Sequence, residues 1–226
     1  MNESTAVVIG ATGMIGSEVV KLLLDDSRYN KIRVIVRSWK GPQHPKLEVL
    51  IGAFDNLPVL KQQLGDGEAI FCCMGTTQKQ VKGDKKLYRH IDLEIPLAIA
   101  EQGVNKGFQQ FLLISAIGAN KNAGNFYLAL KGEVEQLVKQ LSFDTIHIFQ
   151  PSMLIGNRKE KRFGEIIAKH LMTFFSFTMA GKLSRFKAIQ ATSVAHAMVN
   201  AAADKSVGIF TYQYNEIVHL AAKRLR

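Results

Sequence analysis

The residues with the clearest chemical potential are Tyr127 and Lys131, which stand four positions apart in a segment with a helical pattern. On an α-helix this spacing puts both side chains on one face, with about 5–6 Å between their Cβ atoms. A phenol, with an unperturbed pKa of about 10, is a poor acid–base group at neutral pH unless a neighbouring ammonium stabilises its phenolate. Of the five tyrosines, only Tyr127 has a lysine four residues later, and Ser115 ends a predicted strand shortly before it. The pattern predicts an acid–base site made of Ser115, Tyr127 and Lys131.

A second candidate site is the glycine-rich segment 10–16, which stands between an apolar run and a helical pattern. Gly10 permits a tight turn, Gly13 lets the backbone approach a pyrophosphate, and Gly16 lets the helix pack closely on a sheet. The start of the following helix would present free N–H groups and its positive dipole end to phosphates. The segment therefore predicts a dinucleotide-binding loop. Its predicted contact residues are Gly10, Thr12, Gly13, Met14, Ile15 and Gly16.

The end of the next apolar run indicates which dinucleotide is preferred. About 20 residues beyond the glycines, NAD-binding proteins usually carry Asp or Glu for the ribose 2′-hydroxyl. This chain has Val36 followed by Arg37 and Ser38 instead. A guanidinium suits a 2′-phosphate, which it can bind through two parallel hydrogen bonds. We therefore expect NADP(H) to be preferred over NAD(H).

The elements that must position these residues alternate along the chain. Short, almost continuously apolar runs, typical of strands covered on both faces, are separated by longer helical patterns. The predicted strands cover residues 6–9, 32–36, 47–50, 69–73, 110–114, 145–149 and 209–212. The predicted helices cover residues 14–24, 57–64, 87–102, 126–141, 163–175, 194–202 and 216–224.

This alternation predicts an α/β fold, a Rossmann-type doubly wound parallel sheet with right-handed crossovers. We expect a single NAD(P)-binding domain over residues 1–226, because no linker or change of composition divides the chain. The part from about 151 to 226 is less regular and is expected to cap the substrate side, outside the carboxyl ends of the strands.

The overall composition fits a globular protein and narrows the choice of partners. Of the 226 residues, 47% are hydrophobic and 21% are charged, which excludes wholesale disorder. The net charge of +10 attracts anions such as nucleic acids, membrane surfaces or phosphorylated ligands. Because the basic residues are spread along the chain and no recognition motif accompanies them, nucleic acid is not favoured as a partner.

Three features bear on the compartment. No apolar run reaches the roughly 18 residues that a membrane span needs, so stable membrane insertion is not expected. The polar segment 1–5 leads directly into a predicted strand, which argues against a secretory signal. The adjacent Cys72 and Cys73 fit reduced thiols better than a structural disulfide, and no cysteine or histidine spacing predicts a metal site. We expect a cytoplasmic protein.

Taken together, these motifs resemble the short-chain dehydrogenase/reductase superfamily, and most closely its atypical, Tat-interacting-protein-like (TIP30/CC3-like) branch, which includes small bacterial homologues. The resemblance covers most of the chain, to about Ala202. It rests on the glycine-rich segment and on segments 71–77, 112–115, 125–128 and 131–135. The segments 71–77 (Phe-Cys-Cys-Met-Gly-Thr-Thr) and 131–135 (Lys-Gly-Glu-Val-Glu) are far more specific than the glycines.

The resemblance implies a role for each candidate residue. Tyr127 would protonate a substrate carbonyl as a hydride arrives from the nicotinamide, and Ser115 would orient the carbonyl oxygen. Lys131 would hold the nicotinamide ribose and favour the Tyr127 phenolate. The further cofactor contacts would be Gly75 and Thr76 along the middle of the cofactor, Asp55 near the adenine, and Gln150, Pro151 and Ser152 behind the nicotinamide.

Two positions depart from the family pattern. Ala116 stands where many members carry a second serine, so only Ser115 can serve. Gln150 stands where a human member has arginine, which removes an anion contact from that position.

We therefore expect an oxidoreductase that transfers a hydride between NADP(H) and a small carbonyl or alcohol, with Tyr127 as the acid–base group. The alternative is an NADP(H)-binding sensor with little or no catalysis that acts through a protein partner. Epimerisation or dehydration of a nucleotide sugar is disfavoured, because it needs a larger substrate domain than the segment after Pro151 provides. A homodimeric or other protein partner stays open, and no motif identifies the substrate.

Overall fold

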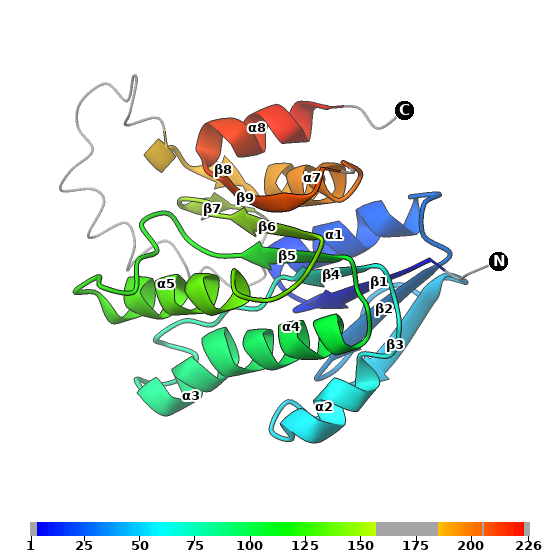
Figure 1. The fold of residues 1–226 in the computed structure, drawn as a ribbon, viewed down its shortest axis with the longest axis horizontal. Helices are drawn as coiled ribbons and strands as arrows, with labels where there is room; N and C mark the ends of the chain where they lie inside the picture. The colour runs from blue at the N-terminus through cyan, green and yellow to red at the C-terminus, as the bar shows by residue number, and fades with distance from the viewer. Residues whose placement is uncertain (1–3, 157–184, 205, 224–226) are drawn as a thin grey trace.

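The centre of the protein is a seven-stranded sheet whose strands all run parallel, in the order β3-β2-β1-β4-β5-β6-β9 (Figure 1). The computed structural model describes residues 4–156, 185–204 and 206–223. The strands are β1 (Thr5–Ile9), β2 (Lys31–Val36), β3 (Leu47–Ile51), β4 (Ala69–Cys72), β5 (Gln110–Ile114), β6 (Thr145–Phe149) and β9 (Gly208–Tyr212). The sheet confirms the predicted Rossmann-type, doubly wound α/β fold.

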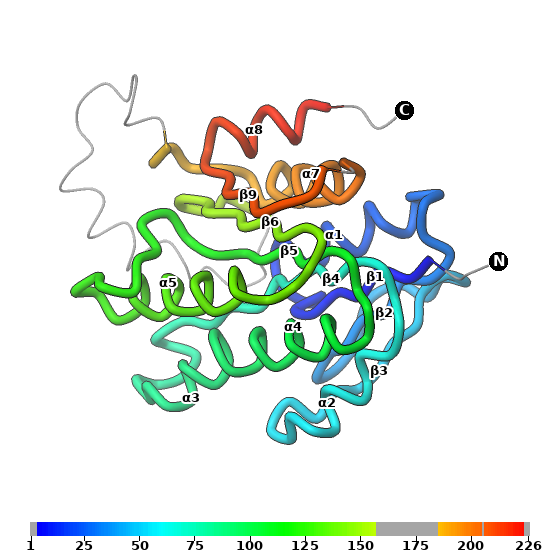
Figure 2. The backbone as a smooth tube through the Cα atoms, in the orientation of Figure 1, coloured from blue at the N-terminus to red at the C-terminus, as the bar shows by residue number. Residues whose placement is uncertain are grey.

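Helices cover both faces of this sheet (Figures 1 and 2). One face carries α1 (Met14–Leu24), α7 (Ala191–Ala201) and α8 (Tyr214–Ala222). The other face carries α2 (Leu57–Gln63), α3 (Lys85–Arg89), the π-helical turn η1 (His90–Glu94), α4 (Ile95–Asn105) and α5 (Phe126–Val138). A separate two-stranded parallel sheet joins β7 (Leu154–Ile155) to β8 (Ile189–Gln190).

The two hydrophobic cores follow from the alternation of side chains along each strand. Val8 and Val34 belong to the core on the α1 side, whereas Val7 and Ile35 belong to the core on the α4 side. All four are fully buried. Because both faces of the central strands are covered, a segment such as β4 (Ala69–Cys72) is continuously apolar, and this is why the sequence reveals it so clearly.

The predicted helix over 87–102 is wrong in one respect, since it is divided into α3, η1 and α4. Pro96 stands in the first turn of α4 and has no backbone N–H, so a regular ladder of helical hydrogen bonds cannot run through it. The predicted helix over 163–175 lies outside the described residues. The predicted substrate-side cap over about 151–226 is only partly within the described residues, and it stays a prediction.

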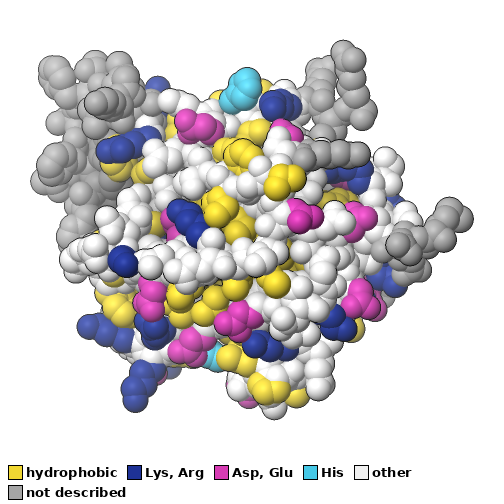
Figure 3. Space-filling view, viewed as in Figure 1, with side chains coloured by type: hydrophobic (Ala, Val, Ile, Leu, Met, Phe, Trp, Pro, Cys, Tyr) yellow, Lys and Arg dark blue, Asp and Glu magenta, His cyan; other side chains and the backbone are white. Residues whose placement is uncertain are grey.

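Two surface properties complete the description. On the face shown in Figure 3, lysine and arginine side chains lie among aspartates and glutamates and do not gather into one basic patch. Within the described ranges, no helix is both long and apolar enough to cross a bilayer.

Candidate active site

Most of the predicted site residues directly follow the carboxyl ends of parallel strands, so the topology brings them to one edge of the sheet, whereas Tyr127 and Lys131 lie on α5. Gly10 comes after β1, Arg37 after β2, Gly75 after β4, Ser115 after β5 and Pro151 after β6. The strand order reverses between β1 and β4, and the crevice at such a switch point is where doubly wound sheets bind ligands.

The glycine-rich loop is shaped by close backbone contacts. Gly10 has a φ of +79°, and a Cβ there would lie 2.5 Å from the carbonyl oxygen of Cys73 on the neighbouring segment. A Cβ at Gly16 would overlap the carbonyl oxygen of Gly10. Gly13 caps α1 and has no side chain with which to bond the first-turn N–H groups. Those N–H groups are therefore available to an external acceptor at the exposed Thr12 side of the loop.

Arg37 and Ser38 lie directly beyond β2, where the sequence predicts recognition of the adenosine ribose. Both are exposed, and neither makes a hydrogen bond or ion pair with any residue that the structure describes. Asp55, predicted to lie near the adenine, is exposed after β3. Its neighbour Phe54 accepts a hydrogen bond from Nε2 of His90 at 2.8 Å, which ties this loop to η1.

Lys131 is buried and paired with a residue that sequence reasoning missed, Asp92 of η1. The Nζ atom of Lys131 lies 2.8 Å from Oδ1 of Asp92, and the two side chains are 3% and 0% exposed. Oδ2 of Asp92 accepts a hydrogen bond of 2.8 Å from the backbone N–H of Thr76. Burial alone would lower the pKa of Lys131, but the nearby Asp92 carboxylate raises this pKa above its usual value.

Tyr127 lies on α5 one turn before Lys131, partly buried against the ring of Tyr88 at a centroid distance of 6.2 Å. Burial raises the pKa of Tyr127, Lys131 lowers it, and Asp92 raises it again. The net direction is upward. Lys131 thus acts in the direction of the Tyr127 phenolate, but burial and the Asp92 carboxylate together outweigh the ammonium.

Ser115 belongs to a buried chain of hydrogen bonds. Its hydroxyl donates to Oε1 of Glu135, and Nε2 of Gln150 donates to Oε1 and Oε2 of the same carboxylate at 2.9 and 3.1 Å. Gln213 then donates to Oε1 of Gln150 at 3.0 Å. Because the Ser115 proton is committed to Glu135, the Ser115 oxygen can offer only lone pairs to a substrate while this bond persists.

The remaining predicted contacts have varied surroundings. Gly75 is exposed, and a Cβ there would have only Oδ1 of Asp92 within 4 Å, at 3.8 Å, so the space beside it is open. The carbonyl of Pro151 accepts a hydrogen bond from the N–H of Ile117 at 3.0 Å. The hydroxyl of Ser152 donates to the carbonyl of Lys187.

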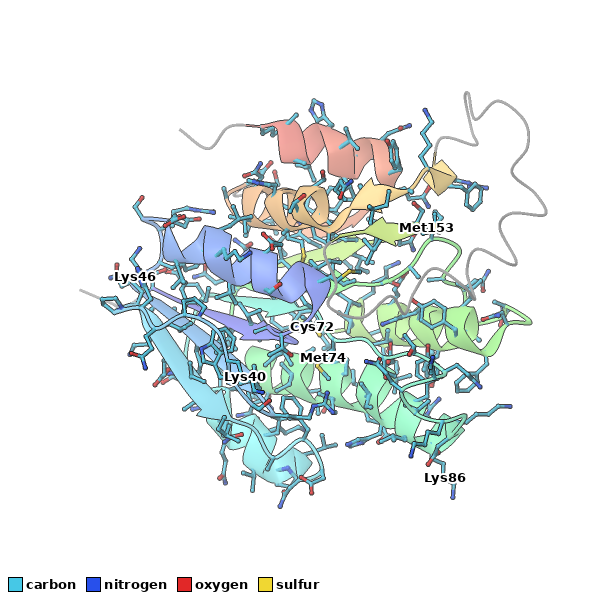
Figure 4. The ribbon with its side chains drawn as sticks, turned by 180° about the vertical axis from the view of Figure 1, so that it is seen from behind. Lys40, Lys46, Cys72, Met74, Lys86 and Met153 are labelled. Carbon is cyan, nitrogen blue, oxygen red and sulfur yellow. The ribbon has the colours of Figure 1, made fainter. Side chains whose placement is uncertain are left out.

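Figure 4 shows the interior of this edge from behind, with Cys72 and Met74 close together where β4 ends beneath α1. Burial raises the pKa of the Cys72 thiol to about 11, which makes it a poor nucleophile at neutral pH. Lys86 stands on the outer end of α3, away from these two residues.

Sequence reasoning missed two buried carboxylates. A signal for Glu135 exists, since positions 127, 131 and 135 repeat every four residues and lie along one side of α5. The sequence around Asp92 gives a weaker signal, because it shows only an acidic residue between two apolar neighbours. Its partners Thr76 and Lys131 come from segments that are distant in sequence.

Comparison with protein families and relatives supports the dinucleotide-binding reading. The NAD(P)H-binding family matches residues 10–205. Protein HTATIP2 of Rattus norvegicus is 29% identical over 203 residues, which are 88% of this chain and 81% of that protein. The mitochondrial protein FMP52 of Candida glabrata is 30% identical over 164 residues, 73% of this chain and 70% of that protein.

Solved structures with a similar fold include UDP-N-acetylglucosamine 4-epimerase from Methanobrevibacter ruminantium M1, at a TM-score of 0.67 and 17% identity. MoeE5 in complex with UDP-glucuronic acid and NAD has a TM-score of 0.70 and 15% identity. Each similarity covers 97% of this chain and 81% of the other. At these identities the likeness is one of fold.

Proposed function

The chain belongs to the NAD(P)H-binding family, in its Tat-interacting-protein-like branch of atypical short-chain dehydrogenase/reductases, and from this membership we propose that it is an NADP(H)-dependent oxidoreductase. Its substrate would be a small carbonyl or alcohol. The observation that carries the proposal is the buried Lys131 one helical turn from the partly buried Tyr127, at the sheet edge where α1 begins.

The residues at this edge fit a dinucleotide. The first-turn N–H groups of α1 suit the pyrophosphate, the exposed Arg37 guanidinium suits a ribose 2′-phosphate, and the space beside Gly75 is open. A bound nicotinamide would supply the hydride in reduction or accept it in oxidation.

The protein side chains would supply the proton and hold the reacting groups in place. Tyr127 would give its phenolic proton to the carbonyl oxygen, and Lys131 would hold the nicotinamide ribose. Ser115 would orient the carbonyl oxygen once its hydroxyl turns from Glu135 to the substrate, and while it donates to Glu135 it would accept a hydrogen bond from a substrate hydroxyl. Pro151 and Ser152 would lie behind the nicotinamide, and Thr76 and Asp55 along the rest of the cofactor.

The test is Tyr127→Phe, which removes one oxygen and keeps the ring. We expect NADPH affinity, followed by nucleotide fluorescence, to change little. Turnover of any carbonyl found in a substrate panel, followed at 340 nm, should fall by about 10²–10⁴-fold. Tyr214→Phe on α8, across the sheet, is the matched control and should keep full turnover.

Two outcomes would contradict the proposal. A Tyr127→Phe protein that turns over substrate at the wild-type rate would exclude Tyr127 as the proton donor. A wild-type protein that binds NADPH but reduces no carbonyl in a broad panel would favour the alternative, a cofactor-dependent sensor that acts through a protein partner.

A further inference from the structure

Asp92 is the most deeply buried carboxylate among the described residues, with no exposed surface. It comes from η1, between α3 and α4, and π-helical turns of this kind are frequent at functional sites. One oxygen accepts the N–H of Thr76 and the other lies 2.8 Å from Nζ of Lys131. Removing one member of such a buried pair would leave an uncompensated charge, so the position of each side chain depends on the other.

Few charges act on the phenol of Tyr127. The titratable groups around it, among the described residues, are Lys131 on α5, Asp92 on η1 and Tyr88 on α3, with Cys72 of β4 behind Lys131. Burial raises the pKa of both Tyr88 and Cys72, so neither carries charge at neutral pH. The charges that remain are the Lys131 ammonium and the Asp92 carboxylate.

These two charges have opposite effects on Tyr127. An ammonium alone beside a phenol would favour the phenolate, as in the expectation from the sequence. A carboxylate in contact with that ammonium offsets its field, and the buried site has little water to screen either charge. Asp92 therefore offsets part of the effect of Lys131 on Tyr127, and burial, the largest of the three effects, favours the neutral phenol.

We propose that Asp92 is a positioning residue that acts through Lys131 to keep Tyr127 protonated at neutral pH, so that the site serves carbonyl reduction. This inference rests on the proposed function. In that direction the carbonyl carbon would gain a hydride from a bound reduced nicotinamide, which would be oxidised, and the carbonyl oxygen would gain the Tyr127 proton. Tyr127 becomes a phenolate and regains a proton from solvent. Alcohol oxidation needs Tyr127 as a base and would require a higher pH.

The test is Asp92→Asn, which keeps an oxygen for the Thr76 N–H and removes the negative charge. Tyr127 is observed by NMR in protein labelled with ¹³C at tyrosine Cζ, its signal being the one that Tyr127→Phe lacks. We expect Asp92→Asn to lower the pH at which Tyr127 ionises by about one to three units. The matched control is Glu133→Gln, which removes the carboxylate of the exposed Arg89–Glu133 pair and should leave Tyr127 unchanged.

The wild-type titration tests the inference even if Asp92→Asn does not fold. Tyr127 of the wild type should stay protonated to at least about pH 10, the unperturbed value. A phenolate formed by pH 8, or an unchanged titration in folded Asp92→Asn, would overturn the role of Asp92 whether or not NADPH binds. Failure of the wild type to bind NADPH would instead contradict the proposed function, and the two failures are thus distinguishable.

Discussion

Arg37 is the side chain on which cofactor preference depends in the proposed function. It follows β2, the neighbour of β1, so it lies at the edge where the glycine-rich loop begins. It is exposed and has no partner among the described residues, so a bound phosphate would not have to compete with an existing ion pair. No acidic residue stands at this strand end to select the 2′-hydroxyl of NAD.

We therefore expect Arg37→Ala to weaken NADPH binding by about 1.5–3 kcal/mol, the contribution of a charge-assisted hydrogen bond, and to affect NADH little. Fluorescence titration of the wild type and of each variant, with NADPH and with NADH, measures these affinities. Lys40→Ala, which removes another exposed positive charge three residues later, is the matched control. Equal affinity of the wild type for NADPH and NADH would refute the preference.

The catalytic candidates show which properties of the site can be predicted from the spacing of residues in the sequence and which cannot. Tyr127 and Lys131 are predictable because four residues on one helix fix their relation. The environment that sets their charge is not predictable in this way. Asp92 and Glu135 each meet their partners through contacts between distant segments, as in the bonds from Thr76 and Gln150. The sequence therefore predicts the acid–base pair, and the fold determines its protonation.

At the scale of elements, η1 is the feature that organises the site. His90 begins this turn, Asp92 stands inside it, and Pro96 follows in α4. The ring of His90 lies between Oε2 of Glu94 at 2.9 Å and the carbonyl oxygen of Phe54 at 2.8 Å. A carboxylate and a carbonyl oxygen both accept hydrogen bonds, so both bonds form together when the two ring nitrogens carry protons. The imidazolium links η1 to the loop that contains Asp55.

This link should make stability depend on pH. The hydrogen bond to Glu94 raises the pKa of His90, with smaller contributions from Phe54 and Asp55, while its partial burial opposes the shift. Because the folded pKa exceeds the unfolded value, the stabilisation is complete below about pH 6.5 and is lost as pH rises through the folded pKa.

We expect His90→Gln to be less stable than the wild type at pH 5.5 and to approach it at pH 8.5, in urea unfolding followed by circular dichroism. His219→Gln, at an exposed position of α8, is the control and should show no such convergence. A stability difference between His90→Gln and the wild type that stays constant across this range would refute the imidazolium link.

Strands and helices were predictable to different degrees. The strands were recovered because burial on both faces leaves continuous apolar runs. The helices of the segment from 87 to 102 were harder to predict, because its apolar positions fit one helix and only Pro96 signals an interruption. A proline in the first turn of a helix is also compatible with a simple helix start, so its effect depends on the preceding turn.

At the scale of the whole molecule, a second histidine with a shifted pKa lies on β6, beside the edge strand β9 of the sheet. His147 of β6 is buried and stacks on Phe210 and Tyr212 of β9, at centroid distances of 5.7 and 5.8 Å. Its Nδ1 lies 3.0 Å from the hydroxyl of Tyr212. Its Nε2 is buried with no hydrogen-bond partner among the described residues, so a second proton would have no acceptor there.

Burial lowers the pKa of His147 to about 4, with Asp204 opposing the shift. This pKa shift is opposite in direction to that of His90, so stability changes with pH in the opposite sense. The unfolded chain takes up a proton below about pH 6.5, whereas the folded chain takes it up only near pH 4, so stability falls as pH falls through this window. The expected loss from this one side chain is about 3 kcal/mol.

We expect His147→Phe, which keeps an aromatic ring against Phe210 and Tyr212, to lose less stability than the wild type between pH 7 and pH 4.5. Urea unfolding at several pH values measures both proteins. Carboxylates that titrate in the same range act equally on the two, so they cancel in the comparison. His219→Gln serves again as the control. Parallel stability curves for His147→Phe and the wild type would mean that His147 takes up its proton over the same pH range in the folded and the unfolded chain, and would refute the lowered pKa.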